Sequence, residues 1–151
     1  ILRIIRELLT LRPMGKRTDL GVGLEYFMRV VRKRCVAFLL SDFLDSHDYR
    51  QQLAMTRRRH DVVAVQVYDK RMADLPNVGL MKLEDAETGH LQYVDTSSRR
   101  VRQIHAAWWQ QHSEQLDNLF NRTQVDYARI ATGSDYVKGL KGLFVRRTAV
   151  R

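Results

Sequence analysis

Two short segments of the chain carry residues whose side chains can bind a metal ion. Thr18 and Asp19 lie in the polar loop 16-KRTD-19, and Ser41, Asp42 and Asp45 follow the apolar run 35-CVAFLL-40. Hydroxyl and carboxylate oxygens are the ligands that magnesium prefers, and the ion usually keeps some water as well. The residues also have a structural alternative, because threonine caps helices and aspartate caps turns. A metal site requires the two segments to meet in the fold.

The elements around these segments alternate between helix and strand. Apolar residues recur at helical spacing in five stretches, 1–12, 19–33, 46–58, 98–122 and 135–147. Short β-branched or apolar runs predict three strands, at 35–41, 61–69 and 126–135. Two strand-like segments around a turn-rich centre predict a β-hairpin at 79–95. The expected fold class is α/β, a Rossmann-like three-layer parallel sheet with helices on both faces and an inserted hairpin.

The predicted strands end in polar residues, and this explains why a buried strand is followed by carboxylates. Ser41 and Asp42 end the first strand, Asp69 ends the second, and 132-TGSD-135 ends the third. In open parallel sheets, ligands bind beyond the carboxyl ends of the strands. Asp42 is therefore expected where the chain leaves the core, at the functional edge of the sheet.

The net charge of +9 and the sequence pI near 10.1 permit binding to nucleic acid or to anionic lipid. The basic clusters 32–34 and 57–59 fall at predicted helix C-termini, where positive charge offsets the helix dipole. We therefore predict both clusters on the sheet edge opposite Thr18 and Asp42. No aromatic residues interleave with them and no known DNA- or RNA-binding motif accompanies them, so nucleic-acid binding remains an alternative that rests on charge alone.

Several motifs carry a family resemblance. The threonine loop and the strand ending LLSDFLD resemble the second and third metal-site motifs of the von Willebrand factor A domain. The segments GKRTDL, FLLSDFLD, RRRHDVVAVQVYD, LEDAETGHLQYVDTS and SDYVKGLKGLF resemble, over nearly the whole chain, the bacterial family of unknown function numbered fifty-eight. This resemblance implies an A-domain-like fold and a role beside MoxR-type AAA+ ATPases.

The same resemblance implies roles for the five residues. Thr18 would supply a hydroxyl and Asp42 a carboxylate to Mg²⁺, or to Mn²⁺ or Ca²⁺, while Asp19, Ser41 and Asp45 would orient these ligands or contact a partner. The family's first motif, Asp-x-Ser-x-Ser, does not occur in this sequence. We therefore expect an incomplete metal site, and residues 1–151 as the C-terminal part of a single A-like domain.

The function expected from this site is a non-catalytic, metal-dependent protein-binding adaptor that acts with a MoxR-type ATPase in complex assembly or cofactor insertion. An enzymatic alternative would use Asp42 and Asp45 as a metal-assisted hydrolytic pair, but the sequence shows no nucleophile and base at a useful spacing. A partial sheet would also leave strand 35–41 at an edge with Val36, Phe38 and Leu40 uncovered, so self-association is expected.

Cysteine content and hydropathy bear on the cellular location. Cys35 is the only cysteine, which excludes a disulfide within the chain, and no segment approaches the roughly 20 apolar residues of a membrane span. We predict a cytoplasmic location and leave open a parent protein that is anchored to a membrane by upstream segments.

Overall fold

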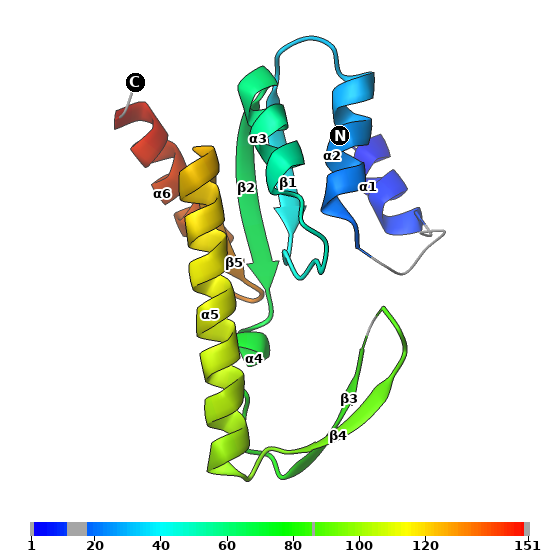
Figure 1. The fold of residues 1–151 in the computed structure, drawn as a ribbon, viewed down its shortest axis with the longest axis vertical. Coiled ribbons are helices and arrows are strands. Elements are labelled where there is room, and N and C mark those ends of the chain that lie inside the picture. The colour runs from blue at the N-terminus through cyan, green and yellow to red at the C-terminus, as the bar shows by residue number, and fades with distance from the viewer. Residues whose placement is uncertain (1, 12–17, 86, 150–151) are drawn as a thin grey trace.

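A three-stranded parallel sheet is the centre of the computed structural model, which describes residues 2–11, 18–85 and 87–149. The strands are β1 (Val36–Ser41), β2 (Asp61–Tyr68) and β5 (Asp126–Ala131), in the order β1-β2-β5 (Figure 1). The helices packed on the sheet are α2 (Leu20–Val30), α3 (Arg50–Arg59), α5 (Arg99–Thr123) and α6 (Tyr136–Ala149). The predicted Rossmann-like α/β class is confirmed.

Strand β2 is buried on both faces, which accounts for its continuous apolar sequence. Val62 and Ala64 belong to a core cluster with residues of α2, α3 and α5. Val63 and Val65 belong to a second cluster, in which Leu143 of α6 is fully buried. Helices therefore cover the sheet on two faces, three on one side and α6 on the other.

Strand β1 lies at the edge of the sheet, and every second side chain of the strand is exposed. Val36, Phe38 and Leu40 are 57%, 48% and 65% exposed, as the sequence predicts for an uncovered edge strand. These side chains lie on the α6 side, where the ring of Phe144 packs on the ring of Phe38, at 6.4 Å between ring centroids. The apolar surface of β1 is thus largely open within the described chain.

The predicted hairpin is present as an antiparallel pair, β3 (Leu80–Glu84) and β4 (Leu91–Asp95). It leaves the start of α5 and arches away from it, toward the side of the molecule where α2 and α1 (Leu2–Thr10) lie (Figure 1). At its tip the Glu87 carboxylate accepts a hydrogen bond from the backbone N–H of Thr18, at 2.9 Å. The hairpin therefore reaches the threonine loop. The short helix α4 (Lys70–Ala73) was not predicted.

Two helix boundaries differ from the sequence-based prediction. Helix α2 ends at Val30 rather than near residue 33, because the backbone of Val31 is already extended. Helix α3 begins at Arg50 rather than near residue 46, because side-chain-capped turns occupy residues 41–49. The second difference lengthens the loop that follows β1, which is the loop that carries Asp42 and Asp45.

The two basic clusters lie at the edge where the parallel strands begin. Arg57, Arg58 and Arg59 form the last turn of α3, directly before β2, and residues 32–34 lie in the loop before β1. Asp42 follows Ser41, the last residue of β1, and so lies at the opposite end of the strand. The predicted separation of the basic clusters from Asp42 is confirmed.

Candidate functional site

The turn after β1 is held in an unusual backbone conformation. The hydroxyl of Ser41 accepts a hydrogen bond from the backbone N–H of Phe43 (3.0 Å), and the carboxylate of Asp42 accepts one from that of Leu44 (3.1 Å). Phe43 has a φ of 60°, in the left-handed region that a bulky residue rarely enters. Its ring is buried and packs edge to face on Phe120 of α5, at 5.3 Å. Packing of the ring therefore holds a strained turn at the carboxyl edge of the sheet.

Asp45 connects this turn to the start of α2. Its Oδ2 atom accepts a hydrogen bond from the backbone N–H of Leu20 (2.7 Å), and its Oδ1 atom accepts one from that of His47 (2.8 Å). The Nδ1 atom of His47 lies 2.8 Å from the same Oδ1, and the Asp45 side chain has no exposed surface. Burial raises the pKa of Asp45, but the hydrogen bonds from Leu20 and His47 outweigh it and hold the pKa below its usual value. The two oxygen-rich segments of the sequence therefore meet, through Asp45.

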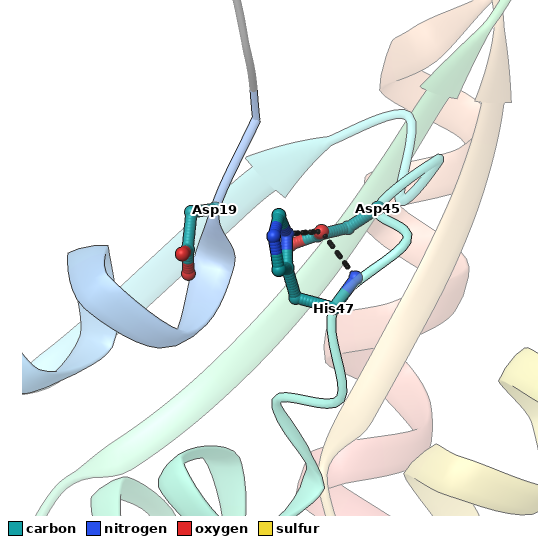
Figure 2. A group of neighbouring side chains, drawn as sticks. All are labelled: Asp19, Asp45 and His47. Atoms are coloured by element: carbon teal, nitrogen blue, oxygen red, sulfur yellow. Dashed lines mark hydrogen bonds and ion pairs between the residues drawn. The ribbon is translucent and has the colours of Figure 1, made fainter.

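Asp19 caps α2 beside this pair. Its Oδ1 atom accepts a hydrogen bond from the backbone N–H of Val22, at 2.9 Å. The alternative in which Thr18 caps the helix is wrong, since the helix begins at Leu20 and the residue before it provides the cap. Asp19, Asp45 and His47 each offer one ligand atom, and these atoms lie within 4.8 Å of one another (Figure 2).

His47 was not predicted as a site residue from the sequence. Its hydrogen bond to Asp45 is the main cause that raises its pKa, and the charge of Asp19 and a hydrogen bond to the backbone of Thr18 raise it further. A signal for it was present in the sequence, because an aspartate two residues before His47 can accept a hydrogen bond from the His47 backbone N–H and form an Asx-turn. His47 thereby links the loop after β1 to the threonine loop before α2.

The two predicted direct ligands are placed differently. Asp42 does not belong to the group formed by Asp19, Asp45 and His47. Its backbone carbonyl accepts a hydrogen bond from Gln66 of β2 (3.2 Å), and its charge acts on His112 of α5. Burial and then the charge of Arg129 lower the pKa of His112, and Asp42 only opposes this shift. The backbone of Asp42 is therefore tied to β2, whereas Thr18 lies beside His47, and a metal-binding role for either stays a prediction.

Comparison with known proteins assigns the chain to a family. The family model described as "Protein of unknown function DUF58" matches residues 1–115. The chain belongs to this DUF58 family. An uncharacterized protein of Mycobacterium avium is 39% identical over 77 residues, which are 51% of this chain and 46% of that protein. One from Mycobacterium tuberculosis is 40% identical over 77 residues, 51% of this chain and 24% of that protein.

The DUF58 chain thus spans less than half the length of these curated relatives. A crystal structure of an uncharacterized membrane spanning protein from Vibrio fischeri aligns with 99% of this chain and 66% of its own, at 17% identity and a TM-score of 0.28. In the part of the DUF58 chain that the structure describes, no helix combines the length and the apolar character needed to cross a bilayer.

A groove adjoins the site of this DUF58 chain. It has a volume of about 710 Å³ and runs between the loop after β1 and the side of α5. Asp45, His47 and Asp48 line it from the loop after β1, and His112 and Arg122 line it from α5. The groove is lined by both acidic and basic side chains and by apolar ones such as Phe43 and Leu116.

Proposed function

We propose that this chain is a non-catalytic protein-binding module that holds its partner through a divalent cation at the carboxyl edge of the sheet. The partner is a MoxR-type AAA+ ATPase, and the pair acts in complex assembly or cofactor insertion. The observation that carries the proposal is the hydrogen bond from Leu20 to Asp45, because it holds the Thr18–Asp19 segment against the loop after β1.

The donor atoms of this edge fit Mg²⁺, Mn²⁺ or Ca²⁺. Thr18 offers a hydroxyl and Asp42 an exposed carboxylate, and both are of the type these ions bind. Asp45 already accepts hydrogen bonds on both oxygens and has no exposed surface, so its role is to orient the two loops rather than to bind the ion. Asp19 and His47 lie next to Asp45 and share that role. The ion would supply a positive charge that accepts an acidic side chain of the partner.

The same geometry disfavours the hydrolytic alternative. That mechanism needs two carboxylates that reach a substrate or its metal ion. The Asp45 side chain is enclosed by backbone N–H groups and by His47, which leaves Asp42 without its second carboxylate.

Paramagnetic broadening by Mn²⁺ tests the metal site, because it detects even weak binding residue by residue. The backbone signals of residues 18–20 and 41–45 should broaden first. Asp42→Ala should abolish this pattern, whereas Asp48→Ala should preserve it, since Asp48 is exposed and pairs with Arg50. Broadening that centres on other residues, or that survives Asp42→Ala unchanged, would exclude the proposed ligands.

Capture experiments test the partner. The immobilised chain is incubated with a MoxR-type ATPase encoded beside a member of the family, in Mg²⁺ or in excess chelator. The proposal expects capture in Mg²⁺ that chelator and Asp42→Ala both abolish and Asp48→Ala does not. Capture that is equal with and without the ion would show that the contact does not use a metal.

A further inference from the structure

The edge at which the parallel strands begin carries most of the net charge of the chain. Nine basic side chains lie there, in the loop before β1 and at the C-terminal ends of α3, α5 and α6: Arg32, Lys33, Arg34, Arg57, Arg58, Arg59, Arg122, Arg146 and Arg147. Two carboxylates, Asp61 and Asp126, begin β2 and β5 beside them. The edge therefore has a formal excess of seven positive charges, of the nine that the whole chain carries.

Only part of this charge stabilises the fold. Arg147 forms ion pairs with Asp61 and Asp126, and Arg57 lies 4.0 Å from Asp61 and donates a hydrogen bond to the backbone carbonyl of Gln124. These contacts fasten α3 and α6 to the strand starts. Arg59 and Arg146 also donate hydrogen bonds, to the backbone carbonyls of Met28 and Tyr127. Four of the nine basic side chains and both carboxylates thus hold the fold together.

The loop before β1 presents charge that the fold does not use. Arg32, Lys33 and Arg34 are all exposed, and within the described residues none of them takes part in an ion pair. Because α2 ends at Val30, these three residues lie beyond its last turn, where the effect of the helix dipole fades. The dipole explanation offered from the sequence therefore does not account for them.

Aliphatic side chains stand beside the basic clusters. Val30 and Val145 are 60% and 66% exposed. Val30 lies two residues before Arg32, and Val145 directly precedes Arg146. Basic groups mixed with exposed aliphatic groups match a bilayer surface, where the former contact anionic headgroups and the latter enter the boundary with the acyl chains. Single-stranded nucleic acid instead favours exposed aromatic rings for base stacking. Residues 32–34 and 57–59 contain none, and the half-exposed ring of Phe144 beside Val145 packs on Phe38.

We propose that this edge docks on an anionic bilayer surface. Docking in this orientation directs the opposite edge, with Thr18 and Asp42, away from the membrane toward a partner in solution. The proposal goes beyond the metal-dependent binding of a partner, since it uses other residues and needs no metal ion.

Vesicle co-sedimentation of the chain tests the proposal. Vesicles of phosphatidylglycerol mixed with phosphatidylcholine should bind the chain, vesicles of phosphatidylcholine alone should not, and added salt should weaken the binding. The triple variant Arg32→Gln/Lys33→Gln/Arg34→Gln should lower the partition coefficient at least about tenfold. The double variant Val30→Ser/Val145→Ser should lower the residual binding in concentrated salt.

A matched control separates position from net charge. Lys70→Gln/Arg71→Gln/Lys138→Gln removes the same formal charge at the opposite edge and should retain most of the wild-type binding. Equal losses in the two triple variants would overturn the proposal, as would tighter binding of duplex DNA than of anionic vesicles at the same salt concentration. Circular dichroism confirms that each variant is folded, and chelator should leave vesicle binding unchanged whether or not the metal site exists.

Discussion

The carboxylate of Asp45 accepts a 2.7 Å hydrogen bond from the backbone N–H of Leu20, which precedes it by 25 residues in the chain. The donor is one of the first N–H groups of α2, which have no partner within the helix. One buried carboxylate thus satisfies the start of a helix and fixes the loop that follows β1. The site depends on this contact, and substitution of Asp45 should show it.

Asp45→Asn is expected to lower the free energy of unfolding by about 1–3 kcal/mol, because an amide in this position cannot accept all three hydrogen bonds and loses the charge that His47 faces. Urea denaturation measures the change. Asp48→Asn is the matched control, and little or no loss is expected there, since the Asp48–Arg50 pair is exposed and screened by solvent. Equal effects of the two substitutions would show that the Asp45 contact is not structural.

The Asp45–His47 pair should make stability depend on pH in a defined direction. The pKa of His47 is raised above 6.5 in the folded protein. The stability that His47 contributes is therefore fully present below pH 6.5 and is lost as the pH rises through the folded pKa. The pKa of Asp45 is held below 3.8, so its contribution is present above that value and is lost as pH falls through the folded pKa. The stability difference between wild type and His47→Gln should therefore be largest between pH 3.8 and 6.5 and shrink in alkaline solution. A difference that does not shrink as the pH rises from this plateau into alkaline solution would refute the pairing.

Replacement of Phe43 by glycine should destabilise the protein less than replacement by alanine, the reverse of the usual order. Phe43→Ala removes a buried ring that packs on Phe120 and should cost about 3–5 kcal/mol. Phe43→Gly removes the same ring, but glycine adopts the left-handed backbone without strain, which is worth about 1–2 kcal/mol. The greater conformational entropy of glycine in the unfolded chain offsets only part of this gain. Phe43→Gly should therefore destabilise the protein less than Phe43→Ala. Thermal or urea unfolding of the two variants decides the order. The exposed Tyr26→Ala, within about 0.5 kcal/mol of wild type, is the control.

Strand β1 should mediate self-association. Its outer backbone groups are unpaired within the described sheet, and Val36, Phe38 and Leu40 are exposed beside them. Sedimentation velocity over a concentration series should show reversible association that Leu40→Lys weakens. Val22→Lys, which places the same charge on an exposed position of α2, should leave it unchanged. Strictly monomeric behaviour at all concentrations would show that the edge is protected in another way.

The sequence predicted most of the fold because its strands and helices have strong patterns. The unbroken apolar run of β2 marks a strand buried on both faces, and the turn-rich centre of the hairpin separates two strand-like segments. The start of α3 was missed because it depends on consecutive side-chain caps in residues 41–49, which replace the first helical turn. Local hydrogen bonds of this kind leave no periodic signal.

The candidate site could be predicted only in part. The sequence indicated that Thr18, Asp19, Ser41, Asp42 and Asp45 belong to one edge, and the fold brings the loops that carry them together. It did not indicate that Asp45 is saturated by hydrogen bonds, that His47 joins it, or that Asp19 rather than Thr18 caps α2. Each of these facts depends on contacts between residues distant in the chain or on the direction of one side chain.

The central position of β2 has a consequence for the exchange of backbone hydrogens with solvent. β2 is paired on both sides, with β1 and with β5, and its side chains from Val62 to Val65 are buried on both faces. The amides of β2 should therefore exchange only when the whole structure opens, and they report its global stability. The outward amides of β1 should exchange much faster. If another chain pairs with this edge, the exchange of these amides should slow while that of exposed amides elsewhere stays the same.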